Sequence, residues 1–348
     1  MTETTTPRAG RVNAIGLAQA DYKGLPSTLC QGCGHNSIAN QIVQVAYELS
    51  VRPHEMLKLS GIGCSSKSPA YFLGQSFGFN SLHGRMPSLA TGALTANHHL
   101  QGLAVSGDGD SASIGLGQFK HILRRNVRMV YIIENNGVYG LTKGQFSATA
   151  DEGQELKYAG TNVFPAIDIC MEAILAGCGF VARSFSGDAQ QVRELMKAAL
   201  SHRGTAVLDI ISPCVAFNNE DTSTKSYSYG KENEIPLHGI GFVPRAEEIE
   251  IDAYDPGEVR VVEMHDGSFI KLRKLETDYD PTDRLGAMHR LQWAEENQEF
   301  ITGLVYYDES RPNLAETLNL PATPLSAIED EKIRPTAAVL DGLMSGLM

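Results

Sequence analysis

The chain has 348 residues, and its 41 acidic side chains against 29 basic ones give a formal net charge of −12 at pH 7. This excess of acid argues against a nucleic-acid-binding protein, which would carry a basic stripe, and against docking to an anionic membrane surface. Hydrophobic residues make up 42% of the chain, enough to bury a core, and no apolar run approaches the roughly 20 residues that span a bilayer. The Thr-rich start lacks the apolar core of a secretory signal, so we expect a cytoplasmic protein.

Helix-like and strand-like segments alternate along most of the chain. Residues 1–25 are polar and are expected to form an N-terminal arm, and the alternation defines a domain over residues 26–219. Apolar spacing predicts helices over 36–50, 86–100, 112–125, 166–177 and 188–202. Runs rich in apolar and β-branched residues predict strands over 56–62, 102–106, 127–133, 179–185 and 206–212. Strands separated by helices of this length predict an α/β fold with a doubly wound parallel sheet.

The composition changes after residue 219. Residues 220–236 are polar and irregular, and we expect them to open a C-terminal extension over 220–348 that wraps the domain or a partner subunit. Two strand-like runs, 259–264 and 268–275, flank an Asp-Gly pair, which is a good hairpin signal. Residues 281–300 have the pattern of an amphipathic helix, and the extension otherwise lacks the strand–helix alternation of the domain before it.

A glycine-rich acidic turn follows the predicted strand at 102–106. Gly107, Asp108, Gly109 and Asp110 connect this strand to the next helix. Glycine lets the backbone approach a phosphate, and the N-terminus of a helix adds a favourable dipole. A carboxylate at Asp108 needs a cation beside a phosphate, and Mg²⁺ bridging to diphosphate oxygens is the natural one. Taken alone, the same sequence is also a common turn.

A second polar sequence, which begins with Asn135 and Asn136, follows the next predicted strand. Neighbouring parallel strands end at the same edge of a sheet, where ligands bind in doubly wound folds. We therefore expect Asp108 and Asn136 to bind the same ion. The alternative is that the two sequences are unrelated turns without a shared ligand. The pairing resembles the thiamine diphosphate motif, which implies that Asp108, the side chain of Asn136 and the backbone carbonyl of Val138 hold Mg²⁺.

The six cysteines need a separate explanation, because an intracellular chain rarely carries a disulfide framework. Cys30 and Cys33 form a CxxC pair, which alone fits a zinc knuckle, a redox pair or half of an iron–sulfur site. A redox pair would follow a strand, and no clear strand precedes this one. Cys64 and Cys214 follow predicted strands, so the three loci can converge. Four thiolates near a thiamine site suit a redox cluster better than a structural zinc ion.

Six motifs along the chain form one pattern. They are CQGCGH at 30–35, GIGCSSK at 61–67, LHGR at 82–85, GDGD at 107–110, NNGVYGLTKGQ at 135–145 and PCVAFN at 213–218. Together they resemble the β subunit of a 2-oxoacid:ferredoxin oxidoreductase over residues 29–218. The resemblance implies a domain that binds thiamine diphosphate, Mg²⁺ and a [4Fe-4S] cluster. The implied cluster ligands are Cys30, Cys33, Cys64 and Cys214.

The resemblance also implies a set of cofactor contacts. They lie in the loops after successive strands and are Gly63, Cys64, Ser65, His83, Gly107, Asp108, Gly109, Asp110, Asn136, Val138, Tyr139, Gly140 and Leu141. The chain departs from the commoner family pattern at Gln31 and in 147–149, where alanine stands between Ser147 and Thr149. We expect neither departure to touch a ligand position.

The implied reaction is the oxidative decarboxylation of a 2-oxoacid with coenzyme A, which gives acyl-CoA and CO₂ and passes electrons through the cluster to ferredoxin. Lys67 is implied to face the substrate or coenzyme A. The loop that contains Leu141 and Lys143 resembles the segment that lines the substrate pocket. Lys143 offers a cation to a second carboxylate, which favours 2-oxoglutarate over pyruvate. For both lysines, a solvated surface position is the alternative.

Three further candidates are His35, His83 and Arg85. The histidines can hydrogen-bond cofactor or substrate, or can simply stabilise their loops. Arg85 can neutralise a substrate carboxylate or merely a helix end.

One expected catalytic group is missing from this sequence. Thiamine enzymes need a glutamate against the aminopyrimidine ring, normally from a second α/β domain, and we expect an α subunit to supply it. The assembly would then be a heterodimer or α2β2, with ferredoxin, a 2-oxoacid and coenzyme A as its other partners. Two alternatives stay open: a non-redox thiamine diphosphate decarboxylase or synthase, and a zinc-stabilised scaffold subunit.

Overall fold

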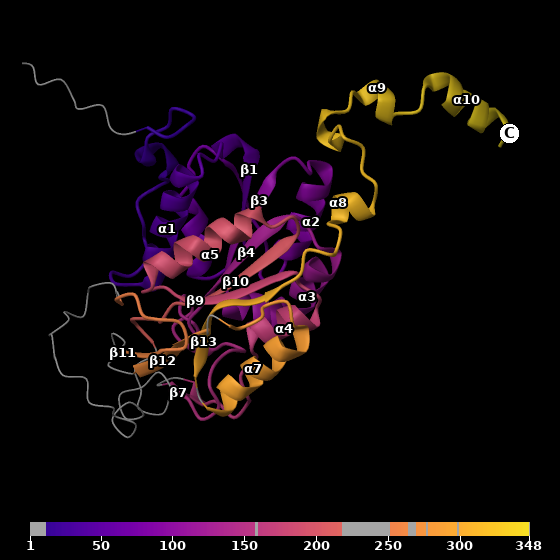
Figure 1. Cartoon of the computed structure of the whole chain (residues 1–348). Coiled ribbons are helices and arrows are strands. Elements are labelled where there is room, and N and C mark those ends of the chain that lie inside the picture. Colours follow the sequence, from indigo (N-terminus) through magenta and orange to yellow (C-terminus); the bar gives the residue numbers. More distant parts are fainter. Residues whose placement is uncertain are drawn as a thin grey trace, which may run out of the picture.

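A nine-stranded sheet forms the centre of the molecule, in the order β11-β12-β13-β9-β10-β4-β3-β1-β2 (Figure 1). The computed structural model describes residues 12–156, 159–217, 251–263, 269–275, 278–297 and 299–347. The parallel strands are β1 (Met56–Ser60), β2 (Phe77–Asn80), β3 (Gln101–Gly107), β4 (Met129–Asn135), β9 (Phe180–Phe185) and β10 (Thr205–Ile211). The predicted doubly wound α/β fold is confirmed.

Helices cover both faces of the sheet. One face packs against α2 (Met86–Ala96), α3 (Leu116–Arg125), α4 (Ile169–Leu175) and α7 (Arg284–Glu296). The other face packs against α1 (Gly34–Glu48) and α5 (Ala189–Ser201). Side chains alternate across β4, so that Tyr131 and Ile133 join the first layer and Val130 and Ile132 the second. Burial on both faces explains why this strand reads as a continuous apolar run.

The carboxyl ends of four central strands meet at one edge of the sheet. Ser60 of β1 pairs with Val105 of β3, and Gly107 of β3 pairs with Glu134 of β4. Asn135, the last residue of β4, pairs with Ile211 at the end of β10. The loops that follow these strands therefore leave the sheet side by side, as expected from the sequence.

Two elements of the domain differ from expectation. The helix predicted from 112 begins only at Leu116, because Gly109–Ile114 forms a π-helical turn directly after the acidic sequence. The edge strand β2 was not predicted, since Phe77 is 59% exposed and all its neighbours in the strand are also exposed. β2 has only four residues, and glycine and asparagine, both uncommon in strands, alternate with its two exposed phenylalanines.

The C-terminal extension adds strands to the same sheet. β11 (Val259–Glu263) and β12 (Phe269–Lys274) form the predicted hairpin, although its turn lies outside the described residues. β12, α7 and β13 (Phe300–Tyr307) form a strand–helix–strand unit with parallel strands, and β13 pairs antiparallel with β9. The expectation of no strand–helix alternation after 219 was therefore wrong. The predicted helix was carried to residue 300, which hid the start of β13.

Both ends of the described chain bear on the predicted domain limits. In the predicted N-terminal arm, Tyr22 is fully buried and its hydroxyl donates a hydrogen bond to the carbonyl of Val51. Residues 329–347, called here the C-terminal arm, contain α9 (Asp330–Ile333) and α10 (Ala337–Ser345). Every side chain described in this arm is exposed, and the arm points away from the sheet (Figure 1). The limits at 25 and 219 remain a prediction, and the predicted boundary at 220–236 lies outside the described residues.

None of the helices in the described ranges combines the length and the apolar character needed to cross a membrane.

A buried histidine outside the catalytic edge gives a prediction for the stability of the fold. His202 is 5% exposed, packs against the rings of Phe180 and Tyr307, and has no hydrogen-bond partner on either ring nitrogen within the described residues. Burial lowers the pKa of His202 below its usual value. The unfolded chain then binds this proton more readily, so the free energy of unfolding falls as the pH drops through about 6.5.

The matched variant is His202→Phe, which keeps a ring at this position and removes the titration. We expect the difference in unfolding free energy between pH 7.5 and 5.5, measured by urea denaturation, to be smaller for this variant than for wild type. Equal pH dependence in the two proteins would show that His202 does not titrate as described.

Candidate active site

A cavity of about 90 Å³ lies at the carboxyl ends of β1, β3 and β4. All the cofactor contacts expected from the sequence line this cavity, and so does His35. They are Gly63, Cys64, Ser65, His83, Gly107, Asp108, Gly109, Asp110, Asn136, Val138, Tyr139, Gly140 and Leu141. Residues more than 75 positions apart in the sequence thus converge on one small space.

Asp108 is 1% exposed and is held mainly through one of its two oxygens. Oδ2 accepts hydrogen bonds from the N–H of Gly137 at 3.1 Å and from Oγ1 of Thr149 at 2.8 Å. The hydroxyl of Ser147 donates to the same oxygen. Oδ1 accepts a longer hydrogen bond, at 3.3 Å, from the N–H of Asn136. Oδ1 is therefore the less saturated oxygen and the one better able to take a cation.

A chain of buried polar groups continues from Thr149 into the core. Its Oγ1 lies 2.9 Å from Oδ1 of Asn135, whose amide nitrogen donates to Asp209 at 3.1 Å. Nε of Arg183 donates to the other oxygen of Asp209 at 2.8 Å, and Nη2 donates to Asp168 at 2.9 Å. The amide nitrogen of Asn135 faces Asp209, which can only accept. The amide oxygen of Asn135 must therefore face Thr149. The buried ion pair thus orients groups next to Asp108.

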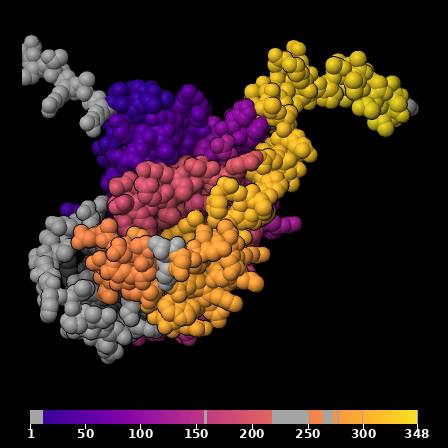
Figure 2. All heavy atoms as spheres, in the orientation of Figure 1, coloured from indigo at the N-terminus to yellow at the C-terminus, as the bar shows by residue number. Residues whose placement is uncertain are grey.

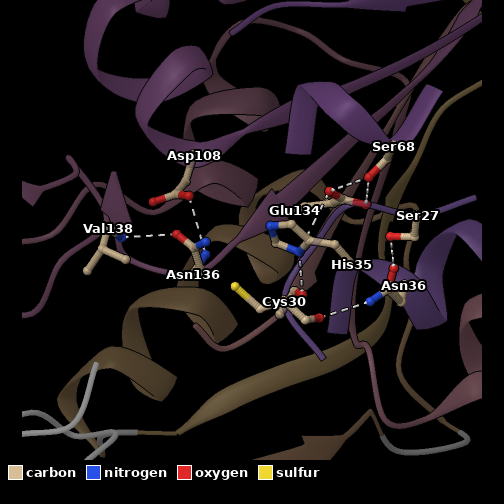
Figure 3. A network of polar contacts seen from close by, with 10 residues as sticks. Ser27, Cys30, His35, Asn36, Ser68, Asp108, Glu134, Asn136 and Val138 are labelled. Atoms are coloured by element: carbon tan, nitrogen blue, oxygen red, sulfur yellow. Dashed lines mark hydrogen bonds and ion pairs between the residues drawn. The ribbon is translucent and has the colours of Figure 1, made fainter. Parts of the chain in front are cut away.

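Asn136 and Val138 lie in the turn between β4 and β5 (Val138–Tyr139), which pairs with β6 (Gln145–Phe146). Oδ1 of Asn136 accepts the N–H of Val138 at 3.1 Å, and Gly137 between them has a φ of 72°. That positive φ requires glycine for an unstrained turn. The turn keeps Asn136 beside Asp108, as Figure 3 shows.

Asp110 fastens the loop that contains His83. Its carboxylate accepts the N–H of Gly84 at 2.8 Å and the hydroxyl of Ser106 at 2.7 Å. Nδ1 of His83 lies against the same carboxylate, and the imidazole is 34% exposed. The geometry fixes His83 at the mouth of the cavity.

Gly109 is required by the ring that covers it. The hydroxyl of Tyr139 donates to the carbonyl of Gly109 at 2.8 Å, and a Cβ on this glycine would lie 2.5 Å from the Tyr139 ring. Any larger residue would push the ring and the β5 turn away from the GDGD turn. Gly109 thus allows the two halves of the motif to approach each other.

The four predicted thiols lie in three segments of the chain, and of the four residues Cys64 lines the cavity. A Cβ on Gly140 would lie 3.5 Å from Sγ of Cys214 and 3.6 Å from Sγ of Cys64, so both sulfurs lie beside this glycine. Cys33 occupies the position before the first residue of α1 and makes no side-chain capping hydrogen bond, and Cys30 is exposed just before it. Burial, with smaller effects from the nearby Cys214 and Cys30 thiols, raises the pKa of Cys33 to about 12.

In the described part of the chain, no three His, Cys, Asp or Glu side chains form a group that could hold a metal ion. The two remaining cysteines, Cys170 and Cys178, are buried in the core, and neither lines the cavity.

Known proteins share this arrangement of sequence and fold. Residues 61–210 match the family model described as "Thiamine pyrophosphate enzyme, C-terminal TPP binding domain". The chain is 41% identical over 199 residues to the 2-oxoacid:ferredoxin oxidoreductase subunit beta of Sulfolobus sp, which covers 57% of this chain and 65% of that protein. It is 33% identical over 219 residues to the 2-oxoglutarate synthase subunit KorB of Methanocaldococcus jannaschii. This alignment covers 62% of this chain and 80% of that protein.

The chain belongs to the family of 2-oxoacid:ferredoxin oxidoreductase β subunits. The resemblance inferred from the motifs is thereby confirmed. The fold agrees with a solved structure, the 2-oxoglutarate:ferredoxin oxidoreductase from Magnetococcus marinus with 2-oxoglutarate, coenzyme A and succinyl-CoA bound. The TM-score is 0.70 at 28% identity, over 95% of this chain and 100% of that chain.

Three of the residues predicted to be catalytic do not line the cavity. They are Lys67, Arg85 and Lys143. Lys67 is half-buried, and its charge acts on the thiol of Cys64. Arg85 is exposed at the start of α2, and Lys143 is exposed with a φ of 77°. Their roles remain predictions, whereas His35, His83 and Leu141 do line the cavity.

The segment at 147–149, where the sequence departs from the commoner family pattern, also supports Asp108. Ser147 and Thr149, which flank the differing residue, both donate their hydroxyls to Asp108. That the departure itself touches no ligand position remains a prediction. Ala148, the residue that differs from the commoner pattern, donates its N–H to Ser113 at 2.9 Å, a bond that proline could not make.

Glu134 is a buried residue at the cavity that the sequence analysis missed. It ends the apolar run of β4, is 0% exposed, and accepts the hydroxyl of Ser68 at 3.1 Å on both oxygens. Burial raises the pKa of Glu134 well above its usual value and lowers the pKa of neighbouring His35 to about 4. The sequence did contain a signal for this residue, since Glu134 is the single acidic side chain at the end of an apolar strand.

Proposed function

We propose that this chain is the β subunit of a 2-oxoacid:ferredoxin oxidoreductase, which oxidatively decarboxylates a 2-oxoacid with coenzyme A to acyl-CoA and CO₂. Two electrons pass to ferredoxin, and the reaction is reversible in principle. The observation that carries the proposal is the meeting of two groups at one cavity: the sulfurs of Cys64 and Cys214 flank Gly140, and Asp108 and Asn136 line the same space. The names of the relatives support 2-oxoglutarate as substrate. Pyruvate is the second candidate.

The donor set around Asp108 fits Mg²⁺ and a diphosphate. Mg²⁺ prefers oxygen ligands from one or two carboxylates and from the phosphates themselves. Oδ1 of Asp108 accepts only one long hydrogen bond, so a cation can bind there at little cost in hydrogen bonding. The amide oxygen of Asn136 and the carbonyl of Val138 belong to the adjacent turn. Asp108, Asn136 and Val138 would hold the ion, and Gly107 and Gly109 would let the diphosphate approach the backbone.

Cys30, Cys33, Cys64 and Cys214 would hold the [4Fe-4S] cluster. Cysteine thiolates are the usual ligands of such clusters, and these four come from three segments, with the sulfurs of Cys64 and Cys214 both beside Gly140. Burial raises the pKa of Cys33 to about 12 and that of Cys214 to about 11, so iron must displace their protons on binding.

Bound thiamine diphosphate would supply the carbanion chemistry at the 2-oxo carbon, and the cluster would supply one-electron transfer, neither of which a side chain provides. The chain's own residues bind and orient. Asp110 fixes the loop of His83 through Gly84 and Ser106. Lys143 would offer its ammonium group to the second carboxylate of 2-oxoglutarate.

Lys67 and Leu141 would contact the other reactants of the same site. Lys67 is half-buried in the segment that follows Cys64, where its ammonium group would face the substrate or coenzyme A. Leu141 lines the cavity and is 48% exposed, so it would contact the substrate at the cavity mouth. His35 and Arg85 stay candidates for contacts with the cofactor or a substrate carboxylate.

An α subunit would complete the catalyst by supplying the glutamate and the domain for the pyrimidine side of the cofactor, in a heterodimer or α2β2. The C-terminal arm, which stands free in Figure 2, would pack on that subunit. Its exposed apolar residues are Ile333, Val339, Leu340, Leu343, Met344 and Leu347. A nine-residue helix with no buried side chain is marginal in water, so α10 needs a partner surface.

The test uses the full chain co-purified anaerobically with its α subunit. We expect reduction of methyl viologen that requires coenzyme A and is faster with 2-oxoglutarate than with pyruvate. CO₂ release without viologen reduction would instead support a non-redox thiamine diphosphate decarboxylase. Zinc without iron in the purified protein would support a scaffold subunit.

The Ser147–Thr149 support of Asp108 gives a second expectation. Thr149→Val keeps the shape of the side chain but removes the hydroxyl, and we expect the dissociation constant for Mg²⁺, with thiamine diphosphate present, to rise about 10- to 100-fold. Isothermal titration with MgCl₂ measures it. Thr91→Val, which removes a hydroxyl bonded to a helix carbonyl in α2, is the control and should bind Mg²⁺ as wild type does. Equal weakening in both variants would contradict the role of Thr149.

A further inference from the structure

The three segments that carry the four thiols are tied together by a buried polar cluster, shown in part in Figure 3. The cluster, called here the Glu134 cluster, consists of Glu134 with Ser68, His35 and Ser212. Ser68 follows Cys64 by four residues, His35 follows Cys33 by two, and Ser212 precedes Cys214 by two. Each thiol-bearing segment therefore contributes one member, and β4 contributes the carboxyl group between them.

Short distances connect these four side chains. The hydroxyl of Ser68 donates to both carboxyl oxygens of Glu134 at 3.1 Å. Oε2 of Glu134 lies 3.6 Å from Nδ1 of His35, and the same nitrogen lies 2.6 Å from Oγ of Ser212. No member is more than 1% exposed. Thus a continuous line of contacts runs from the Cys64 segment through β4 to the CxxC segment and on to the Cys214 segment.

Neighbouring contacts hold the CxxC segment in the same way. A Cβ on Gly34 would lie 2.7 Å from Oγ of Ser212, so the start of α1 packs directly on the Cys214 segment. Nδ2 of Asn36 donates to the carbonyl of Cys30 at 3.2 Å, and the hydroxyl of Ser27 donates to Oδ1 of Asn36 at 2.5 Å. The loop around the exposed thiol is therefore tied to the same helix as His35.

A carboxyl group at the position of Glu134 lowers the stability of the fold, so stability does not explain its presence there. The rest of β4 is buried among apolar side chains, and a carboxyl group there must be desolvated. An apolar residue of similar size would pack without that cost. The partners of Glu134 all come from other segments, and each partner lies within four residues of a thiol. The arrangement is what the positioning of metal ligands requires, since supporting hydrogen bonds fix the ligands' orientation.

We infer that Glu134 is a positioning residue, which through Ser68, His35 and Ser212 sets the relative placement of the four thiols that receive the iron–sulfur cluster. The inference rests on the proposed function, because it requires that the thiols bind a cluster. Glu134 itself ligates nothing in this account.

The test uses the full-length chain, purified anaerobically and reconstituted with iron and sulfide, in wild-type form and as three variants. Glu134→Leu removes the acceptor for Ser68 and His35. Glu134→Gln keeps a carbonyl oxygen and the side-chain volume. Ser68→Ala breaks only the tie to the Cys64 segment. Two quantities are measured: the rate of iron loss to a chelator, and the EPR spectrum of the dithionite-reduced cluster.

Glu134→Leu is expected to lose iron at least about 10-fold faster than wild type and to change the EPR line shape. Glu134→Gln should restore both properties, and Ser68→Ala should change the line shape. The control is Glu299→Leu, which breaks a carboxylate–Arg273 pair in the C-terminal strands and should lower the melting temperature only. A purely structural role would make Glu134→Leu behave like this control.

The outcomes separate the inference from the function on which it rests. Wild-type protein that binds no iron overturns the proposed cluster, and the positioning role with it. Wild-type protein that binds iron, with Glu134→Leu unchanged in iron loss and EPR spectrum, overturns the positioning role alone. If Glu134→Leu does not fold, Ser68→Ala decides, and a wild-type spectrum for that variant counts against the inference.

Discussion

Cys64→Ser is expected to remove the iron–sulfur cluster and, with it, the 2-oxoacid-dependent reduction of viologen. The sulfur of Cys64 lies beside Gly140 next to that of Cys214, so its loss opens the cluster site on the cavity side. The readouts are iron and sulfide per chain and the broad absorbance at about 400 nm that iron–sulfur clusters show. Binding of thiamine diphosphate with Mg²⁺ should persist, because Asp108 and Asn136 do not depend on the thiol.

The matched control for this variant is Cys178→Ala. Cys178 is 1% exposed in the core, and its loss should lower stability without changing the iron content. Cluster loss in both variants would mean that iron depends on the general integrity of the fold. Full iron content in Cys64→Ser would remove Cys64 from the set of ligands.

Asp108→Asn is expected to abolish cofactor binding while leaving the chain folded. The amide of asparagine keeps the size of the buried carboxylate and an oxygen that can accept from Gly137 and Thr149. We therefore expect a melting temperature without cofactor close to that of wild type. Activity of the reconstituted pair should fall by more than about 100-fold, since loss of supporting groups alone costs 10- to 100-fold.

The decisive readout is the thermal shift caused by the cofactor. At a thiamine diphosphate concentration about 100 times its dissociation constant, binding stabilises wild type by about 2.7 kcal/mol, and this gain should be absent in Asp108→Asn. Asp188→Asn is the control, because Asp188 is a buried carboxylate that accepts the N–H of Gln191 at 3.0 Å and does not line the cavity. A wild-type shift in Asp108→Asn would contradict the assigned role.

The half of the site that is proposed to bind the diphosphate was predictable from local sequence. Asp108 and Asn136 each follow an apolar strand, and parallel pairing brings those strand ends together whatever the rest of the fold does. The glycines at 107 and 109 mark the turn for the same reason. Periodicity and turn chemistry act over a few residues, and that range suffices here.

The supporting contacts could not be predicted, because they join residues distant in sequence. Ser68 and Glu134 are 66 residues apart, and His35 and Ser212 are 177 apart. No local pattern reports such a pairing. Thr149 illustrates the same limit: its hydroxyl reaches Asp108 only because the β5–β6 hairpin folds back beneath β4.

The C-terminal strands show a different limit. β13 was hidden within a run predicted as helix, and its place beside β9 is set by an antiparallel contact that the sequence does not encode locally. The hairpin of β11 and β12 was predicted, since its Asp-Gly signal lies between the two strands. The turn signal of the hairpin acts within a few residues and was reliable, whereas the order of strands in the sheet depends on contacts between residues distant in sequence.

The central claim is that one chain brings a thiamine diphosphate site and a redox cluster to the same cavity. It is tested most directly by adding 2-oxoglutarate and coenzyme A to the anaerobic, cluster-loaded α–β pair with no electron acceptor present. We predict that the cluster becomes reduced, with bleaching at about 400 nm and a new EPR signal, and that Cys64→Ser shows neither. Release of CO₂ with an unchanged cluster spectrum would contradict the account.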